Sequence, residues 1–221
     1  MFTVIGGVMD DLNGVGGVTI QDQVLQTIIF GCGPVGTVCP GTIIIEQAGL
    51  AGVNQMGIYD LTNPATRVTI FLGPEGAGTA RSFSFDVGDG SVIVGATDTN
   101  TFFGSGTSFG LFIDNGSNVF FSQDALNSDL QRHVLIFHTE SGGFSSNGIG
   151  ILDHSFLFAF EDLPTGAFGA DFDYNDFIYN FKVPFEAPPP VIPEPSSVLL
   201  FGLGGLGSVA RLRKRRAAQR A

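Results

Sequence analysis

The chain alternates short apolar runs with clusters of glycine, asparagine and aspartate. Polar and apolar side chains alternate within RSFSF, residues 81–85, so we expect Phe83 and Phe85 to face a core. Short runs that are rich in Ile, Val, Phe and Thr and are bounded by turn residues predict β-strands. The runs that fit this description are 42–47, 67–72, 81–86, 91–95, 108–114, 118–122, 133–138, 155–160 and 176–183.

Turn signals separate the predicted strands, whereas helical periodicity is nearly absent. DNGSN, residues 114–118, contains the Asn-Gly pair typical of tight hairpins, and DGS, residues 89–91, predicts another turn. Only residues 122–132 fit one or two helical turns, with Leu126 and Leu130 four positions apart. We therefore predict an all-β fold, an antiparallel and jelly-roll-like β-sandwich, with a barrel as the alternative.

Composition divides the chain into four predicted parts. Residues 1–40 are expected to form N-terminal strands of the β domain, and residues 41–183 the β-sandwich itself. Residues 184–195, PFEAPPPVIPEP, contain six prolines and predict a stiff, extended linker. Residues 196–221 predict a short transmembrane helix with a basic tail. The opening MFTVIGGVMDDLNG has no Lys or Arg before its apolar patch, so it does not resemble a secretory signal peptide.

The charges are distributed unevenly between these parts. Residues 1–195 hold all 21 acidic residues and four of the ten basic ones, which gives a formal charge of −17. Residues 196–221 hold six basic residues and no acidic ones, and the two parts together give the net charge of −11. Phosphate binding requires clustered Lys and Arg, so the large acidic part is not expected to bind nucleic acid.

The segment after the linker is apolar and then basic. Residues 198–210 carry no charge, and although a full crossing needs about 20 residues, the long basic side chains that follow can snorkel and recover length. Arginines stay on the cytoplasmic side, so the β domain is expected outside. The G-x-G-x-x-G at 202–207 lacks the βαβ context of a dinucleotide site, and close packing of a membrane helix explains it better. The basic anchor consists of Arg211, Arg213, Lys214, Arg215 and Arg216.

Pro193, Glu194 and Pro195, followed by the apolar run and the arginine cluster, resemble the PEP-CTERM sorting signal of bacterial exported proteins. The resemblance implies export and a transient tether in the inner membrane. It also implies recognition by an exosortase-type transpeptidase and cleavage near the Pro-Glu-Pro. Delivery to the cell envelope or to an extracellular, exopolysaccharide matrix would follow.

A second informative stretch is FEDLPTGAFGADFDYNDFIYNF, residues 160–181. The pattern Phe-Glu-Asp-Leu, a loop and then Asp-x-Asp-Tyr-Asn-Asp-Phe resembles the hallmark of the bacterial domain of unknown function number four-one-one-four. Residues 42–60 are similar to the early part of that domain, and the resemblance covers roughly residues 41–183. It implies an extracellular, β-rich domain with no established reaction.

The acidic residues of this stretch are candidate calcium ligands. Oxygens at positions 171, 173 and 175 of an extended segment share one side, and Ca²⁺ takes roughly six to eight oxygens at about 2.4 Å. An EF-hand loop is not matched, because Asp176 and Lys182 stand where its glycine and glutamate would be. The side chains either bind calcium or accept backbone N–H groups in a tight loop. The residues of this candidate site are Glu161, Asp162, Asp171, Asp173, Asn175 and Asp176.

Cys32 and Cys39 are the two cysteines of the chain. A zinc site needs about four N or S ligands and no histidine is near, so we expect a local disulfide if the chain is exported and two half-buried thiols otherwise. His133, His138 and His154 show no metal-ligand spacing and are expected to be ordinary polar residues at strand ends.

The sequence thus predicts a non-catalytic exported protein of the cell envelope or extracellular matrix, stabilised by calcium if the acidic residues bind it. One alternative is a calcium-dependent carbohydrate-binding module or adhesin that binds exopolysaccharide. The other is a glycoside hydrolase that uses two of the acids. The absence of tryptophan disfavours the hydrolase, because sugar clefts commonly contain it.

Overall fold

The computed structural model describes part of the 221-residue chain. The chain divides into two compact units, Met1–Ala187 and Pro188–Ala221, and the described residues all belong to the first. The predicted sorting motif, tail helix and basic anchor therefore lie outside the described residues. The described residues are 20–21, 30–46, 50, 52–139, 144–146, 149–151, 155–168, 174–182 and 185–186.

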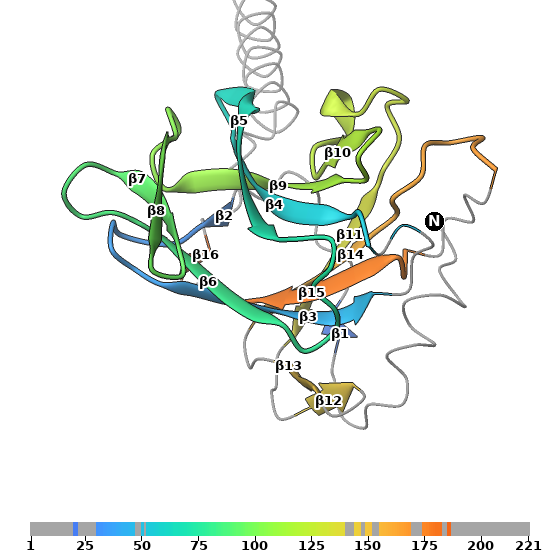
Figure 1. Ribbon diagram of the computed structural model, residues 1–221, viewed down its shortest axis with the longest axis horizontal. Coiled ribbons are helices and arrows are strands. Elements are labelled where there is room, and N and C mark those ends of the chain that lie inside the picture. The colour runs from blue at the N-terminus through green and yellow to red at the C-terminus, as the bar shows by residue number, and fades with distance from the viewer. Residues whose placement is uncertain are drawn as a thin grey trace, which may run out of the picture. The chain divides into compact units, whose positions relative to one another are not determined.

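Two antiparallel sheets form separate layers of this unit, with β9, β4 and β5 in one and β3, β6 and β15 in the other (Figure 1). Sheet A has the spatial order β1 (Ile20–Gln21), β11 (Val134–Thr139), β14 (Ser155–Phe160), β15 (Phe177–Phe181), β3 (Cys39–Glu46), β6 (Ala80–Phe85), β7 (Ser91–Val94) and β8 (Thr97–Phe102). Sheet B has the order β16 (Phe185–Glu186), β2 (Phe30–Gly31), β9 (Ser108–Asp114), β4 (Gln55–Asp60) and β5 (Asn63–Phe71), and β10 (Val119–Phe121) pairs with β9.

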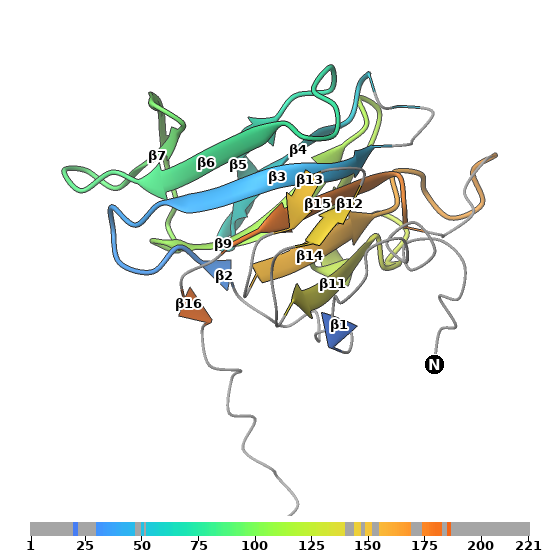
Figure 2. The same ribbon diagram turned by 90° about the horizontal axis from the view of Figure 1, so that it is seen from below.

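A separate hairpin of β12 (Phe144–Ser146) and β13 (Ile149–Ile151) lies on the side of sheet A that faces away from sheet B (Figures 1 and 2). The layered arrangement confirms the predicted all-β, antiparallel sandwich over the barrel. Each predicted apolar run overlaps one of the observed strands. The pairing of β16 with β2 extends into residues 185–186, which the sequence assigned to the proline linker.

Phenylalanine is the most common residue in the core between the sheets. Phe83 and Phe85 are each 1% exposed, as their alternation with polar residues predicted. The Phe83 ring stacks on Phe181 with centroids 5.0 Å apart, and it meets Phe109 of sheet B edge-on at 5.2 Å. The stacked pair lies within sheet A, and the edge-on contact with Phe109 joins the two sheets through ring geometry as well as through buried area.

Strand β4 lies between β9 and β5 in sheet B although its sequence, QMGIYD, was not among the predicted strands. Met56 and Ile58 face the core and are fully buried. Gly57 faces the other way, where an added Cβ would lie 2.0 Å from the carbonyl oxygen of Val68 on β5. The close approach of β4 and β5 at a bulge therefore requires glycine at this position.

A disulfide joins Cys32 and Cys39, and both residues are fully buried in the core. Cys39 begins β3, where it pairs with Phe83 of β6. The loop between the two cysteines is mostly exposed, so the bond fixes a surface loop to the edge of the core.

Helix is nearly absent from the described residues. The segment 122–132, for which one or two turns were expected, contains only the short 3₁₀ helix η1 (Asp124–Leu126). Leu126 and Leu130 are both exposed, so their four-residue spacing does not form an apolar face. Within the described ranges, no helix is long and apolar enough to span a bilayer.

Candidate functional site

The candidate site lies where β14 ends and β15 begins. The two strands are antiparallel, and the last pair in their register is Phe160 with Phe177. The residues just beyond that pair are Glu161 and Asp176, so antiparallel pairing brings the two halves of the acidic sequence pattern together. Between them, the described residues 162–168 and 174–175 contain no helix or strand.

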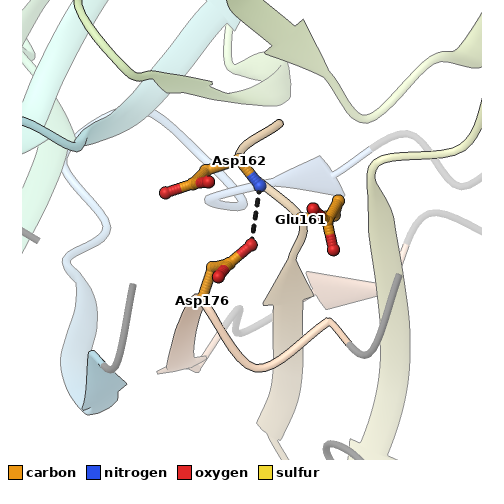
Figure 3. A group of neighbouring side chains, drawn as sticks. All are labelled: Glu161, Asp162 and Asp176. Carbon is orange, nitrogen blue, oxygen red and sulfur yellow. Dashed lines mark hydrogen bonds between the residues drawn. The ribbon is translucent and has the colours of Figure 1, made fainter. Parts of the chain in front are cut away.

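Three carboxyl groups gather at this place. One carboxylate oxygen from each of Glu161, Asp162 and Asp176 lies within 4.8 Å of the others. Glu161 is fully buried and Asp162 is 2% exposed. Figure 3 shows the Glu161 and Asp162 side chains leaving the chain on opposite sides, with Asp176 facing the Asp162 backbone amide. We call these three residues the acidic cluster.

Asp162 connects the acidic cluster to sheet B. Its Oδ2 accepts a hydrogen bond of 2.6 Å from Nδ2 of Asn54, and its carbonyl oxygen accepts another of 2.6 Å from Nδ2 of Asn115. Asn54 directly precedes β4 and Asn115 directly follows β9, next to the paired residues Gln55 and Asp114. The end of sheet A is thus joined to the end of sheet B through one aspartate and two amides.

The carboxylate of Asp176 is held in place by the backbone of Asp162. The backbone N–H of Asp162 donates to Oδ2 of Asp176 over 3.0 Å (Figure 3). Tyr174 takes a left-handed backbone conformation with φ of 59°, and its hydroxyl donates to the carbonyl oxygen of Arg132 over 3.1 Å. Burial raises the pKa of the Tyr174 hydroxyl to about 12, so it stays a hydrogen-bond donor at neutral pH.

His133, the residue before β11, contacts the backbone of Glu161. Its Nδ1 lies 3.1 Å from the Glu161 carbonyl oxygen and its Nε2 lies 3.0 Å from Oδ2 of Asp129. The ring is fully buried and stacks on Phe120 with centroids 3.8 Å apart. His133 thus lies at a strand end, as predicted, and its ring packs in the core.

Asp129 links His133 to Thr165, which follows the acidic cluster residues Glu161 and Asp162 in the chain. Besides His133, its Oδ2 accepts hydrogen bonds from the backbone N–H of Thr165 at 3.0 Å and from the Thr165 hydroxyl at 3.1 Å. Burial by itself raises the pKa of the Asp129 carboxyl, but hydrogen bonds from Thr165, Gln131 and His133 outweigh it and hold that pKa well below its usual range. Asp129 is therefore ionised at neutral pH.

The structure brings together three of the predicted calcium ligands, Glu161, Asp162 and Asp176. Asn175 is described and partly buried, while Asp171 and Asp173 lie outside the described residues. The side chain of His138 and the whole of His154 also lie outside them. Sequence reasoning missed Asn54, Asn115 and Asp129. Asn115 was assigned to a hairpin turn by its Asn-Gly pair, which is correct, since its Oδ1 accepts the N–H groups of Ser117 and Asn118.

Chemically, closely spaced carboxylates with adjacent amides form an oxygen-rich group. Hard divalent cations such as Ca²⁺ take oxygen ligands at about 2.3–2.6 Å, so oxygens that share one ion lie within about 5 Å of one another. The spacing of the acidic cluster fits that limit. Like charges placed this close repel one another unless a proton or a cation neutralises them.

The described residues form a β-sandwich domain that carries the acidic cluster at one end. Residues 92–184 match the family described as Domain of unknown function (DUF4114), and residues 191–216 match the PEP-CTERM protein-sorting motif. Both predicted resemblances are confirmed. The match to the domain of unknown function begins at residue 92, whereas the sequence analysis placed its start near residue 41. No curated protein and no solved structure shows significant similarity to the chain.

The matches settle the broad class of the protein. The sorting motif marks an exported protein that crosses the membrane and is recognised by an exosortase. The matched domain contains the acidic cluster but not Asn54, which lies outside residues 92–184.

Proposed function

We propose that this chain is a non-catalytic protein of the cell envelope or extracellular matrix. Its tail would hold it briefly in the inner membrane, with the basic anchor inside, until an exosortase cleaves near Pro193–Pro195 and releases the β-sandwich outward. The match of residues 191–216 to the sorting motif carries this proposal. The buried disulfide between Cys32 and Cys39 supports it, because such bonds persist in oxidising, extracytoplasmic compartments.

The sorting step is tested by the mass of the mature protein. In the native bacterium, we expect mass spectrometry to find a chain that ends near Pro193–Pro195, and to find the full-length chain when the exosortase gene is deleted. A variant with Pro193→Ala and Pro195→Ala is expected to keep its tail in the presence of the enzyme. An unprocessed chain in both strains would contradict the proposal.

We further propose that the acidic cluster binds calcium and that the ion serves to stabilise the loop between β14 and β15. The supporting observations are the burial of Glu161 and Asp162 and the 4.8 Å limit on the spacing of the three carboxylates. Calcium is scarce in the cytoplasm and abundant outside, so an exported domain can rely on it for rigidity.

Thermal unfolding tests the calcium site. We expect millimolar Ca²⁺ to raise the melting temperature of the full-length chain by about 5 °C or more relative to EDTA, since a ligand that binds only the folded state stabilises it. Asp176→Asn keeps an acceptor for the Asp162 N–H but removes a charge, and it should abolish most of the shift. Asp98→Asn, on the exposed strand β8, is the matched control and should retain it. Identical melting curves for the unmodified chain in Ca²⁺ and EDTA would remove calcium from the proposal.

A calcium-dependent carbohydrate-binding module is a second candidate, and one observation favours it. Phe168, in the loop that follows Glu161 and Asp162, is fully exposed. Exposed aromatic rings commonly stack on sugars, and an aromatic side chain in open solvent otherwise costs solubility. If this candidate is correct, Phe168→Ala will reduce retention of the protein on exopolysaccharide from its own host. Phe102→Ala, on distant β8, is the control.

The hydrolase alternative has less support. Glycosidases place two carboxyls about 5–5.5 Å or about 6.5–9.5 Å apart on either side of a sugar-binding cleft. Glu161 and Asp162 are instead buried and adjacent in the chain. Buried acids of this kind do not face a polymeric substrate.

A further inference from the structure

Asn54 is buried against the acidic cluster with an unsatisfied oxygen. Its side chain is fully buried, and its Oδ1 has no hydrogen-bond partner among the described residues. Buried polar atoms in folded proteins nearly always have a partner, so an orphaned carbonyl oxygen calls for an explanation such as a bound ion or water. The other end of the same amide, Nδ2, contacts Oδ2 of Asp162 at 2.6 Å.

The side-chain amide of Asn54 lies next to the acidic cluster, and its oxygen without a partner can be brought to the cluster by rotating the amide. The oxygen and nitrogen of an asparagine side chain have nearly the same shape, and rotation by 180° about Cβ–Cγ exchanges their places. In the orientation described, the nitrogen donates to the Asp162 carboxylate. After the rotation, Oδ1 would take the place of Nδ2 beside Oδ2 of Asp162. Two oxygens side by side repel one another without a cation, and with a cation they become two of its ligands.

The geometry points to Asn54 as a ligand of the cation that the acidic cluster binds, through its side-chain oxygen, so that one divalent ion joins the two sheets of the sandwich. This inference rests on the calcium site of the proposed function. Amide oxygens are common calcium ligands, and a neutral ligand adds coordination without adding negative charge to a site that already has three carboxylates. Because Asn54 precedes β4 of sheet B while the acids follow β14 and precede β15 of sheet A, the ion would bridge both layers.

Asn115 has a different role, which makes it a useful contrast. Its Nδ2 donates to the Asp162 carbonyl oxygen, and its Oδ1 accepts from the N–H groups of Ser117 and Asn118 at 2.9 and 2.7 Å. Both the nitrogen and the oxygen of this side chain therefore have partners. Asn115 positions the backbone of Asp162, whereas the side-chain oxygen of Asn54 has no hydrogen-bond partner among the described residues.

The experiment uses the full-length chain and calcium alone. Calorimetric titration with Ca²⁺ is carried out on the unmodified chain, on Asn54→Leu and on Asn54→Asp. We expect Asn54→Leu to bind calcium at least about tenfold more weakly, because one protein ligand is lost. Asn54→Asp restores an oxygen and adds charge, so we expect it to bind at least as tightly as the unmodified chain. In EDTA, however, it should melt below the unmodified chain, because its carboxylate then lies beside that of Asp162.

A second measurement separates a ligand from a residue that only supports the fold. Bound Tb³⁺ replaces Ca²⁺, and its luminescence lifetimes in H₂O and D₂O report the number of coordinated waters. We expect one additional water in Asn54→Leu and none in Asn54→Asp. Unchanged affinity and unchanged water number in Asn54→Leu would overturn this inference while leaving the calcium site in place, and would assign the orphaned oxygen to a buried water. If the unmodified chain binds no Ca²⁺ or Tb³⁺, the calcium site and this inference both fall.

Discussion

Asp60 shows how a single buried carboxylate is kept charged in this fold. It is 3% exposed at the end of β4, and its oxygens accept hydrogen bonds from the backbone N–H groups of Thr62 at 2.9 Å, Gly104 at 2.8 Å and Ser105 at 3.1 Å. Burial by itself raises the pKa of this carboxyl, but the hydrogen bonds outweigh burial and lower the pKa from 3.8 to about 2. Asp60 thereby fastens the β8–β9 connection to the β4–β5 turn.

Asp60→Asn is expected to lower the free energy of unfolding by about 2 kcal/mol at neutral pH, the amount that corresponds to the lowered pKa. The folded-state pKa lies below the unfolded value, so the contribution is complete above pH 3.8 and is lost as the pH falls toward 2. Urea unfolding at pH 7 and at pH 2 measures the difference. A variant that is equally destabilised at both pH values would show that the charge of Asp60 contributes nothing.

Tyr179 presents the opposite situation. It is fully buried among aromatic rings, including Phe158 with centroids 4.9 Å apart, and its hydroxyl has no hydrogen-bond partner within the described part of the chain. Burial raises the pKa of that hydroxyl well above its usual value. A buried donor without a partner destabilises the folded state.

We therefore predict that Tyr179→Phe leaves the stability unchanged or raises it by about 1 kcal/mol. Tyr174→Phe is the matched control, since it removes a hydroxyl that donates to the Arg132 carbonyl oxygen, and it should cost about 1 kcal/mol. Chemical denaturation of the two variants gives the comparison. A loss of stability in Tyr179→Phe as large as that in Tyr174→Phe would contradict the prediction.

At this scale, sequence reasoning succeeded where the signal was local. The inward direction of Phe83 and Phe85 follows from strict alternation, and their burial agrees. The contact between Asn54 and Asp162 could not be foreseen, because the two residues are 108 positions apart and meet only when the sheets pack. Asparagine and aspartate are both common in turns, so the sequence around Asn54 and Asp162 does not distinguish residues that join two sheets from ordinary turn residues.

Two of the strands that sequence analysis missed, β4 and β8, have a composition that is not typical of a strand. β4 contains Gly57 in its interior, and β8, TDTNTF, is almost wholly polar. β4 is a strand because Met56 and Ile58 are buried in the core and β5 and β9 pair with it on both sides. Tertiary pairing overrides weak strand propensity here, which single-sequence reasoning has no means to detect.

The glycine in β4 gives a test at the level of this element. Gly57→Ala would place a Cβ 2.0 Å from the Val68 carbonyl oxygen and 2.9 Å from Cα of Thr69, so β4 and β5 would have to separate. We expect a loss of about 3 kcal/mol in the free energy of unfolding, typical of severe overpacking. Gly76→Ala is the control, because nothing lies within 4 Å of the position that its new methyl group would take, and its stability should change little. Equal stabilities for the two variants would show that β4 and β5 tolerate a wider spacing.

For the whole domain, the disulfide is expected to make a substantial contribution to stability. It closes a short loop between positions seven apart, and for loops of this length the loss of unfolded-state entropy corresponds to about 2–3 kcal/mol. The double variant Cys32→Ala, Cys39→Ala should lose about that amount, as measured by urea unfolding. The unmodified chain under strong reductant should behave in the same way, and a reduced chain as stable as the oxidised one would contradict the prediction.

The distribution of charge gives a prediction for the processed protein. Removal of residues 196–221 takes away six basic residues and no acidic ones, so the formal charge changes from −11 to −17. Isoelectric focusing of protein from cells with and without the exosortase should show the processed form at a more acidic position. Cleavage that leaves the arginines attached would produce no such shift.

The exposed strand β8 has a consequence for how copies of this domain meet one another. It ends sheet A in the described part of the chain, it carries Asp98, and Asn100 within it has a left-handed φ of 51°. A bulge also interrupts its pairing with β7. Polar and irregular edge strands of this kind are poor templates for the addition of a further strand. Amyloid-like assembly begins with such strand addition. Two copies of the domain that meet along β8 can therefore stay separate instead of joining into one continuous sheet.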